Sequence, residues 1–334
     1  MIPAVSILVP IYNVSNFIER CTHSLFGQTF EDIEYVFVND CTPDDSVEKL
    51  QKVIEQYPSR KEWVKIIHHE KNRGLAAARN TAIDNSTGQY IAVVDSDDYV
   101  ELDMIELMYQ KAEEEQADMV VSDVFVEHEN QTTILPSLLS DTKEEHFLDL
   151  LERRISKNIW SKLIRRKFYE LPENRVPEGL NIYEDQHVVY RLFFCVNKVV
   201  KAQKPFYHYV QYNPNSITQK TTSLMFENYS RFWQLLDIFL KEKNIYSKYI
   251  DRIEYIKVSN KIGLLLQTNS YSLRKKYAWL FRDIEMKYFH KLHFGGKLML
   301  FFTHYRMYFL AHLIHKLIWL KNKTKKLAHS KIIS

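Results

Sequence analysis

The stretch VVDSDDYV, residues 93–100, runs β-branched residues directly into three carboxylates. The run QYIAVVD (89–95) that leads into it has the length and apolar character of a buried strand. Carboxylates this close repel one another unless a cation, hydrogen-bond donors or water compensates them, and the stretch itself contains no basic residue. The sequence therefore predicts that Asp95, Asp97 and Asp98 lie at the end of a strand, beside a compensating group from elsewhere.

Strand and helix patterns alternate around this stretch. The expected strands are 5–12, 33–40, 64–69 and 89–95, and the expected helices are 14–28, about 46–57, 75–84 and 101–117. This order predicts the α/β class, with a mostly parallel sheet flanked by helices. Ligands bind at the carboxyl ends of the strands in such sheets, and Asn39-Asp40 and Asp95-Ser96-Asp97 both fall there.

The composition agrees with a cytoplasmic protein of two units. The chain has 334 residues and is 46% hydrophobic, which allows a large core. Cys21, Cys41 and Cys195 are scattered and form no CxxC pair, which indicates reduced thiols. MIPAVSILVP at the start lacks a basic segment and continues into a strand pattern, so we do not expect a signal peptide.

The charge is distributed unevenly along the chain. No Asp or Glu follows Glu285, whereas ten Lys and Arg residues do, which leaves 35 basic against 42 acidic residues before that point. A basic end on an acidic body predicts an anionic surface as partner. We favour a membrane over nucleic acid, because no nucleic-acid-binding signature accompanies the basic end.

The two acidic strand ends suit a divalent metal ion. Carboxylates at a shared crevice, with phosphate oxygens completing the shell, are typical of Mg²⁺ or Mn²⁺, and the ion would neutralise charge on a diphosphate. The alternative is that the DSDD residues merely cap the next helix.

A phosphate-binding segment is expected just before the DSDD strand. The chain has neither GxGxxG nor GxxxxGK[ST]. In NRGLAAARN (72–80), Arg73 and Arg79 instead surround a helix start, where backbone N–H groups and guanidinium groups bind phosphates well. The alternative is a solvated helix with incidental arginines.

Six motifs in order resemble a family 2 glycosyltransferase with the GT-A fold, of the bacterial surface-polysaccharide type. They are VSILVPIYN, VNDCTPDDS, NRGLAAARN, VVDSDDYV, IYEDQHVVYRL and YHYVQYNPNSIT. The resemblance covers about residues 4–220, and it implies an inverting transferase that uses a nucleotide-diphosphate sugar and a divalent metal. Two departures are NDCTPDDS, where the family commonly has NDGSTDDS, and Val210, where an arginine often follows the YxY pattern. We expect a catalytic domain at 1–220 and a helical region at 221–334.

The resemblance also implies the donor-binding residues. They are Pro10, Tyr12, Asp40, Arg73, Arg79, Asp95 and Ser96. Tyr12 would lie beside the nucleotide base unless it is a plain core aromatic. Asp40 would accept the N3–H of uracil, which favours a UDP-sugar.

The same resemblance implies two metal-site residues, Asp97 and Asp95, and His208 is a further candidate. Asp97 would bind the metal, and Asp95 would hold the ribose or a metal-bound water. His208 would bind the diphosphate or the metal, although a lone histidine between tyrosines is more often structural.

The resemblance implies that Asp185, in the family's ED pair with Glu184 beside it, is the catalytic base. An acceptor hydroxyl is a poor nucleophile, so inversion requires a base opposite the leaving group. Glu184 would orient the acceptor or tune the pKa of Asp185. The alternative is an acidic pair that only meets the dipole of the helix that starts here.

Trp160 and Lys162, in NIWSKLIRR, are candidates for acceptor binding. Similar proteins have a W-x-K segment at this place, and an indole face stacks well on a sugar ring. A buried tryptophan that anchors a strand is the alternative.

The last part of the chain has helical patterns at 225–243, 246–270 and 273–290, and again from 296 onward. In this last segment helical spacing predicts a polar stripe of Lys297, His304, Tyr308, His312 and His315, and an apolar face of Phe302, Phe309, Leu313, Leu317 and Leu320. Arg306 and Lys316 interrupt the apolar run, which argues against a membrane span and for a helix in the membrane interface. The alternative is a helix that packs on the catalytic domain.

We therefore expect a glycosyltransferase that is peripheral on the cytoplasmic face of the cell membrane. It would move a sugar from a UDP-sugar to a hydroxyl of a glycan or lipid-linked glycan in cell-surface polysaccharide synthesis. One alternative is a nucleotidyltransferase or pyrophosphorylase, which would require a glycine-rich loop after the first strand. Another is a non-catalytic module that binds nucleotide sugars or glycans, which would not require Asp185.

Overall fold

The computed structural model describes residues 2–214, 216 and 222–318. The chain divides into two compact units, Met1–Ser216 and Ile217–Ser334. The sequence analysis expected this boundary four residues later, after residue 220. Each unit is described by itself.

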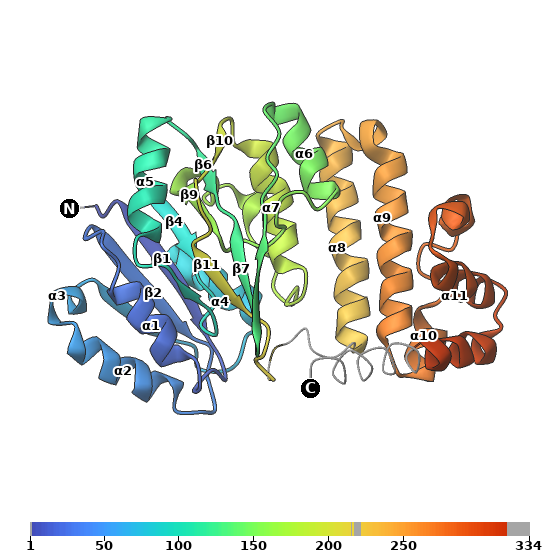
Figure 1. The fold of residues 1–334 in the computed structure, drawn as a ribbon, viewed down its shortest axis with the longest axis horizontal. Coiled ribbons are helices and arrows are strands. Elements are labelled where there is room, and N and C mark those ends of the chain that lie inside the picture. The colour runs from blue at the N-terminus through green and yellow to red at the C-terminus, as the bar shows by residue number, and fades with distance from the viewer. Residues whose placement is uncertain (1, 215, 217–221, 319–334) are drawn as a thin grey trace. The chain divides into compact units, whose positions relative to one another are not determined.

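A seven-stranded sheet forms the centre of the first unit (Figure 1). In spatial order its strands are β10 (Val199–Lys201), β6 (Met119–Val121), β9 (Lys162–Arg165), β4 (Tyr90–Val93), β1 (Val5–Ile11), β2 (Ile33–Asn39) and β3 (Val64–His68). All pairings are parallel except those of β9, which runs antiparallel to β4 and to β6. The predicted α/β class with a mostly parallel sheet is confirmed.

Helices cover both faces of this sheet, and β1 and β2 are therefore buried on both sides. Alternate residues of β1, such as Ile7 and Val9, pack in one cluster with helices α1 (Ile18–Phe26), α2 (Ser46–Gln56) and α5 (Met104–Glu114). Leu8 and Pro10 face the opposite way and line a small cavity with side chains of α4 (Leu75–Asp84) and α7 (Glu184–Cys195). The short helices are α3 (Pro58–Lys61), α6 (Lys143–Leu151), η1 (Arg166–Phe168) and η2 (Pro172–Asn174).

A second, four-stranded sheet was not anticipated from the sequence. Its spatial order is β5 (Tyr99–Val100), β11 (Tyr207–Val210), β7 (Val124–His128) and β8 (Gln131–Leu135). β11 pairs antiparallel with β5 and parallel with β7. This small sheet therefore brings the YHYV segment directly beside the end of VVDSDDYV.

Two predicted helices are shorter than expected at their starts. The helix expected at 14–28 begins at Ile18, after a turn in which Asn13 has a φ of 56°. The helix expected at 101–117 begins at Met104. The residues before it are held in the small sheet, where the Glu101 N–H donates to the Phe206 carbonyl. Pairing with a distant strand thus overrides the local helical pattern.

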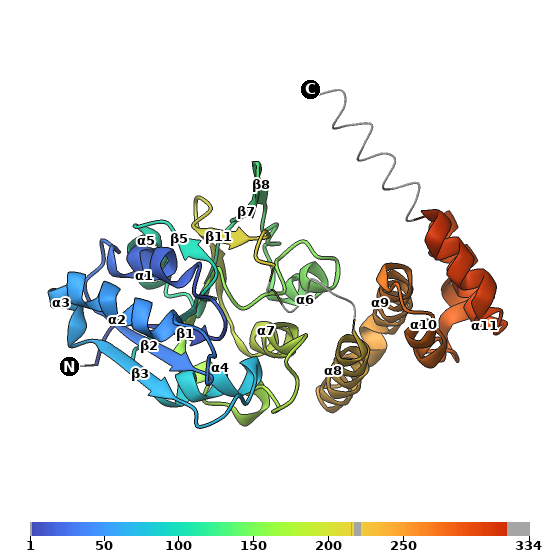
Figure 2. The same cartoon turned by 90° about the horizontal axis from the view of Figure 1, so that it is seen from below.

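The described part of the second unit is helical. Its elements are α8 (Ser223–Glu242), α9 (Tyr246–Gln267), α10 (Tyr271–Tyr277), η3 (Glu285–Lys291), α11 (Phe294–His304) and a further helical stretch at 308–318. α8 and α9 lie side by side (Figures 1 and 2). The helix expected at 273–290 is broken, and Phe281 within it has a φ of 53°. Within the described residues, no helix combines the length and apolarity needed to cross a bilayer.

The amphipathic helix expected from residue 296 is also broken, at a turn where Arg306 has a φ of 60°. In the stretch 308–318, the predicted polar side contacts the unit's own helices. His315 bonds the Leu266 carbonyl at 2.7 Å, and His312 bonds Arg274 at 2.6 Å. The predicted apolar side is exposed at Phe309, Leu313 and Leu317, and Leu320 lies outside the described residues.

Candidate active site

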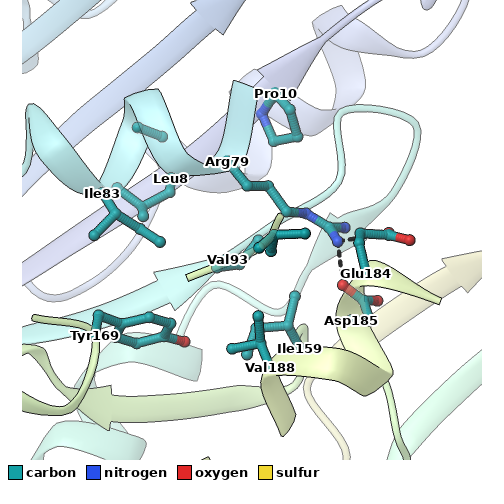
Figure 3. A pocket seen from close by; sticks show the side chains of 12 residues that line it. Leu8, Pro10, Arg79, Ile83, Val93, Ile159, Tyr169, Glu184, Asp185 and Val188 are labelled. Carbon is teal, nitrogen blue, oxygen red and sulfur yellow. Dashed lines mark hydrogen bonds and ion pairs between the residues drawn. The ribbon is translucent and has the colours of Figure 1, made fainter. Parts of the chain in front are cut away.

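Three segments that are far apart in the sequence meet at one edge of the large sheet. Asp95 follows β4, and Glu184 and Asp185 begin α7 after Tyr183, which has a left-handed φ of 71°. Arg79 extends from α4 toward Glu184 and Asp185 (Figure 3), and it also reaches Asp95. Parallel strands end at a common edge, so this is where an α/β sheet binds its ligands.

The Arg79 side chain joins the two acidic groups. Its Nη2 donates to Asp95 Oδ1 at 2.8 Å, and its Nη1 donates to Glu184 Oε1 at 2.7 Å and to Asp185 Oδ1. The side chain is buried, and the hydrogen bonds of Nη1 and Nη2 all go to carboxylates. The expectation that Arg79 holds a phosphate is therefore corrected: its fork geometry is used to hold carboxylates together.

The acidic pair is held in a state that favours proton uptake. Burial raises the pKa of Asp185, and this outweighs the opposing effect of the Arg79 cation. Burial also raises the pKa of Glu184, and repulsion from Asp185 adds to the rise. A carboxylate whose pKa is raised toward the working pH is a better proton acceptor than an ordinary exposed aspartate.

The three carboxylates of the DSDD segment have different surroundings. Asp97 accepts a hydrogen bond from Asn213 Nδ2 at 2.7 Å, and within the described residues no lysine or arginine forms an ion pair with it. Burial, reinforced by the charge of Asp95, raises the pKa of Asp97. Asp95 offers Arg79 only one of its two oxygens.

These surroundings fit a divalent cation. Within the described residues no group of three or more His, Cys, Asp or Glu side chains is arranged to hold a metal by itself. A pair of carboxylates is nevertheless the set that Mg²⁺ commonly uses when substrate phosphates and water supply its other ligands. Asp97 and Asp95 thus fit such an ion, and their mutual repulsion gives a physical reason for one to bind.

Asp98 has a structural part that the sequence analysis missed. It is buried, and its two oxygens accept hydrogen bonds from the Tyr207 hydroxyl and the Val210 N–H, both at 2.7 Å. It therefore ties the DSDD segment to β11 and does not cap α5. The sequence analysis singled out the YHYV motif, which contains both donors. Only the strand pairing shows that Tyr207 and Val210 reach this carboxylate.

Asp40 lies at the end of β2 and organises the loop before α4. It accepts hydrogen bonds from the backbone N–H groups of Arg73 at 2.8 Å and Gly74 at 2.7 Å, and it bonds His69 Nδ1 at 2.7 Å. Gly74 has a φ of 88°, a conformation that favours glycine. The Arg73 side chain is exposed and pairs with Glu178. Uracil recognition by Asp40 stays a prediction.

The other donor residues lie at the ends of β1 and β4. Pro10 is buried in β1 and lines the cavity beside Arg79 (Figure 3). Tyr12 directly follows β1 and is 48% exposed, so it is no core aromatic and its ring is available to a ligand. Ser96 is buried within the DSDD turn. Their donor-binding roles stay predictions.

Trp160 and Lys162 do not form an acceptor surface, because both side chains are buried. Trp160 stacks on Tyr207 with ring centroids 4.9 Å apart and an interplanar angle of 10°. Lys162 Nζ donates to the carbonyls of Ser156 at 3.0 Å and Asn158 at 2.6 Å. The alternative of a buried, anchoring tryptophan describes this position correctly.

His208 likewise uses its ring nitrogens for contacts within the protein. Its Nδ1 bonds Glu127 Oε1 and its Nε2 bonds Glu101 Oε1, both at 2.7 Å. The ring lies between Tyr99 and Phe125, with centroids at 4.1 and 4.5 Å. Since both ring nitrogens already have carboxylate partners, the expectation of His208 as a metal ligand is corrected to a link between β5, β11 and β7.

Comparisons with known proteins agree with this geometry. Residues 6–174 match the family described as Glycosyl transferase family 2. The protein EpsH of Bacillus subtilis (strain 168) is 32% identical over 286 residues, which are 83% of this chain and 81% of EpsH. The protein EpsJ of the same organism is 36% identical over 226 residues, which are 66% of this chain and 64% of EpsJ.

A solved structure shows the same fold. S. aureus TarS 1–349 in complex with UDP-GlcNAc superposes with a TM-score of 0.69 at 17% sequence identity, covering 95% of this chain and 92% of that one. The family match spans more than half of the chain, and EpsH is related over most of its length. The chain therefore belongs to glycosyl transferase family 2 and has the GT-A fold.

Proposed function

We propose that this protein is an inverting glycosyltransferase that moves a hexosyl or N-acetylhexosaminyl group from a UDP-sugar to a hydroxyl of a glycan or lipid-linked glycan in cell-surface polysaccharide synthesis. One observation carries the proposal. A single buried guanidinium, that of Arg79, joins Asp95 at the end of β4 to Asp185 at the start of α7. The donor side and the candidate base therefore share one crevice.

The reaction follows from this arrangement. Asp185 takes the proton of the acceptor hydroxyl while the oxygen of that hydroxyl forms a bond to the anomeric carbon. The bond from that carbon to the diphosphate oxygen breaks, and the electron pair leaves with UDP. Attack opposite the leaving group inverts the configuration. A divalent ion held by Asp97 and Asp95 would neutralise charge on the diphosphate. Arg79 holds Asp185 at the sheet edge where the acceptor hydroxyl has to arrive.

Two observations support uracil as the base of the donor nucleotide. The TarS structures that share this fold contain UDP or UDP-GlcNAc. Asp40 lies at the end of β2, where its carboxylate would accept the N3–H of uracil, and Tyr12 beside β1 offers an exposed ring for stacking.

We expect UDP to bind at least about fivefold more tightly than CDP or GDP. Cytosine has no proton at N3, so the Asp40 carboxylate would lose a partner, at a cost of about 1 kcal/mol or more. Isothermal titration of the three nucleotides with Mn²⁺ present measures the difference. CDP is the matched control, because it has the same ring size, ribose and diphosphate. Equal affinities for UDP and CDP would remove the assignment of Asp40.

We also propose that the second unit attaches the enzyme to an anionic membrane surface on the cytoplasmic side. Phe309, Leu313 and Leu317 recur at intervals of four residues, so they share one side of the stretch 308–318, and all three are exposed. Other exposed apolar side chains nearby in sequence are Phe294, Phe301, Tyr305, Met307 and Leu310. Lysine and arginine are the only charged residues after Glu285. An apolar side with basic surroundings suits an anionic lipid surface.

Replacing Phe309 and Leu317 by serine should weaken binding to vesicles that contain anionic lipid. The two side chains are 66% and 65% exposed, so their loss removes apolar area without opening the core. High salt should weaken binding further, since each basic residue near the surface contributes about 1 kcal/mol. Co-sedimentation with neutral and with anionic vesicles measures both effects.

The control is Ile238→Ser, which removes an exposed apolar side chain from α8 of the same unit. It should leave vesicle binding unchanged. Removal of residues 296–334 is less informative, because Met299, Leu300 and Ala311 are buried and their loss would uncover the unit. If the serine variant binds vesicles like the wild type but changes from oligomer to monomer, this side contacts a second copy of the chain instead.

A further inference from the structure

The turn before β9 lies at the same sheet edge as the candidate active site. β9 is antiparallel to β4, and Ala92 near the end of β4 pairs with Leu163 near the start of β9. The chain therefore enters β9 where β4 leaves the sheet. Residues 156–162, called here the β9 turn, are placed beside Asp95 and Asp185 by this topology, and Figure 3 shows Ile159 beside Asp185.

One side of the β9 turn contacts the candidate base. Ile159 lines the cavity beside Asp185, and its N–H lowers the pKa of that carboxylate. The Lys162 ammonium donates to the carbonyls of Ser156 and Asn158 and so closes the turn that presents this N–H. Lys162 therefore acts on Asp185 through the conformation of the turn, and also through its charge, which lowers the pKa of that carboxylate.

The other side of the turn contacts the donor-side carboxylates. Trp160 stacks on Tyr207. The Tyr207 hydroxyl donates to Asp98 at 2.7 Å and accepts from the Asp95 N–H at 3.1 Å. The indole thus holds a tyrosine that fixes the backbone and one carboxylate of the DSDD segment.

The use of a buried lysine here has a cost. Burial lowers the pKa of Lys162 to about 7, against the opposing effect of Asp185. A methionine of similar length would fill the same space without desolvating an ammonium group. Two carbonyl hydrogen bonds and the proximity of Asp185 offset this cost.

We infer that the β9 turn is a positioning element for the reaction, in which Lys162 sets the catalytic base and Trp160 sets the DSDD segment. The inference rests on the proposed function, because it assigns Asp185 as the base. It replaces the expected contact of these two residues with the acceptor. Two separable consequences follow, one for turnover and one for donor binding.

Lys162→Met should lower kcat by about tenfold or more, since small displacements of a catalytic group are costly. The affinity for UDP should not change, because the donor side is held by Trp160. The deciding measurement is a double-mutant cycle with Asp185→Asn. If Lys162 acts through Asp185, its substitution should cost nothing further once the base is absent. Lys198→Met is the control. Lys198 also donates to a backbone carbonyl, but it directly precedes β10 and so lies at the sheet edge opposite the candidate active site.

Trp160→Phe tests the second consequence, and it also serves if Lys162→Met does not fold. The smaller ring should loosen Tyr207 and raise the Kd for UDP with Mn²⁺ by about threefold or more, with an equal effect in the Asp185→Asn background. An equal fall in kcat for Lys162→Met in both backgrounds would overturn the inference, as would unchanged UDP binding for Trp160→Phe. Failure of the proposed function is distinct: the wild type would then transfer no sugar from any UDP-sugar.

Discussion

Asp185→Asn should lower kcat for sugar transfer by at least about a hundredfold, the lower end expected when a general base is lost. The asparagine keeps the size of the side chain, but it cannot take a proton from the acceptor. UDP affinity should persist, because the base acts on the acceptor side. Release of UDP from the donor, followed with and without acceptor, measures the change.

The pH dependence gives a second measurement of the same assignment. Burial raises the pKa of Asp185, so its basic form appears only above the usual aspartate range near pH 4. Wild-type kcat/KM should therefore rise with pH through this shifted value, and the rise should be absent from Asp185→Asn.

The matched control is Asp118→Asn. Asp118 is also a buried aspartate paired with an arginine, Arg165, but it lies at the amino-terminal end of β6. A comparable loss of kcat in both variants would show a general effect of removing buried ion pairs. Full activity of Asp185→Asn would show that the protein uses another base. Donor binding without transfer in the wild type would favour a non-catalytic binding module.

Asp97→Ala should lower transfer by about a thousandfold or more, and a chelator should reproduce the effect in the wild type. A divalent ion stabilises charge on the leaving diphosphate by several kcal/mol, and each 1.36 kcal/mol corresponds to a factor of ten in rate. The fold should persist, because removal of a carboxylate whose pKa is raised by burial and repulsion relieves a cost. Mn²⁺ titration of the UDP complex provides a readout that does not depend on turnover.

Asp84→Ala serves as the control for this substitution. Asp84 ends α4 on the side away from Gly74, and it pairs with Arg175 at the surface. The Asp84→Ala variant should bind Mn²⁺ and transfer sugar like the wild type. Full transfer in excess EDTA would contradict the metal assignment of Asp97, as would unchanged Mn²⁺ binding by Asp97→Ala.

Local patterns predicted β1, β2 and β4 because these strands are buried on both faces, whereas the three-residue strands β6 and β10 were not predicted. β1 and β2 read as uninterrupted apolar runs that end in turn residues. Short elements that depend on distant partners were not predicted. β5 has two residues, and it exists because β11, more than a hundred residues later, pairs with it.

Charge patterns predicted which residues gather at the site, but not which contacts they make. Arg79 was expected at a phosphate and instead joins Asp95 to Asp185. An arginine at a helix start can serve either an anionic ligand or acidic side chains, and the choice depends on what faces it. The carboxylates that face Arg79 come from segments about 16 and 106 residues away in the chain.

The sequence by itself determined the α/β class, the sheet edge that carries the site, and the acidic residues at that edge. These depend on periodicity and on the rule that parallel strands end together, both of which can be read locally. Tertiary structure alone decided that Trp160 and Lys162 are buried, that His208 lies between two carboxylates, and that the polar side of 308–318 turns inward. The physical reason is that the burial and partners of a side chain depend on segments brought together by folding, and a single sequence carries no local record of those contacts.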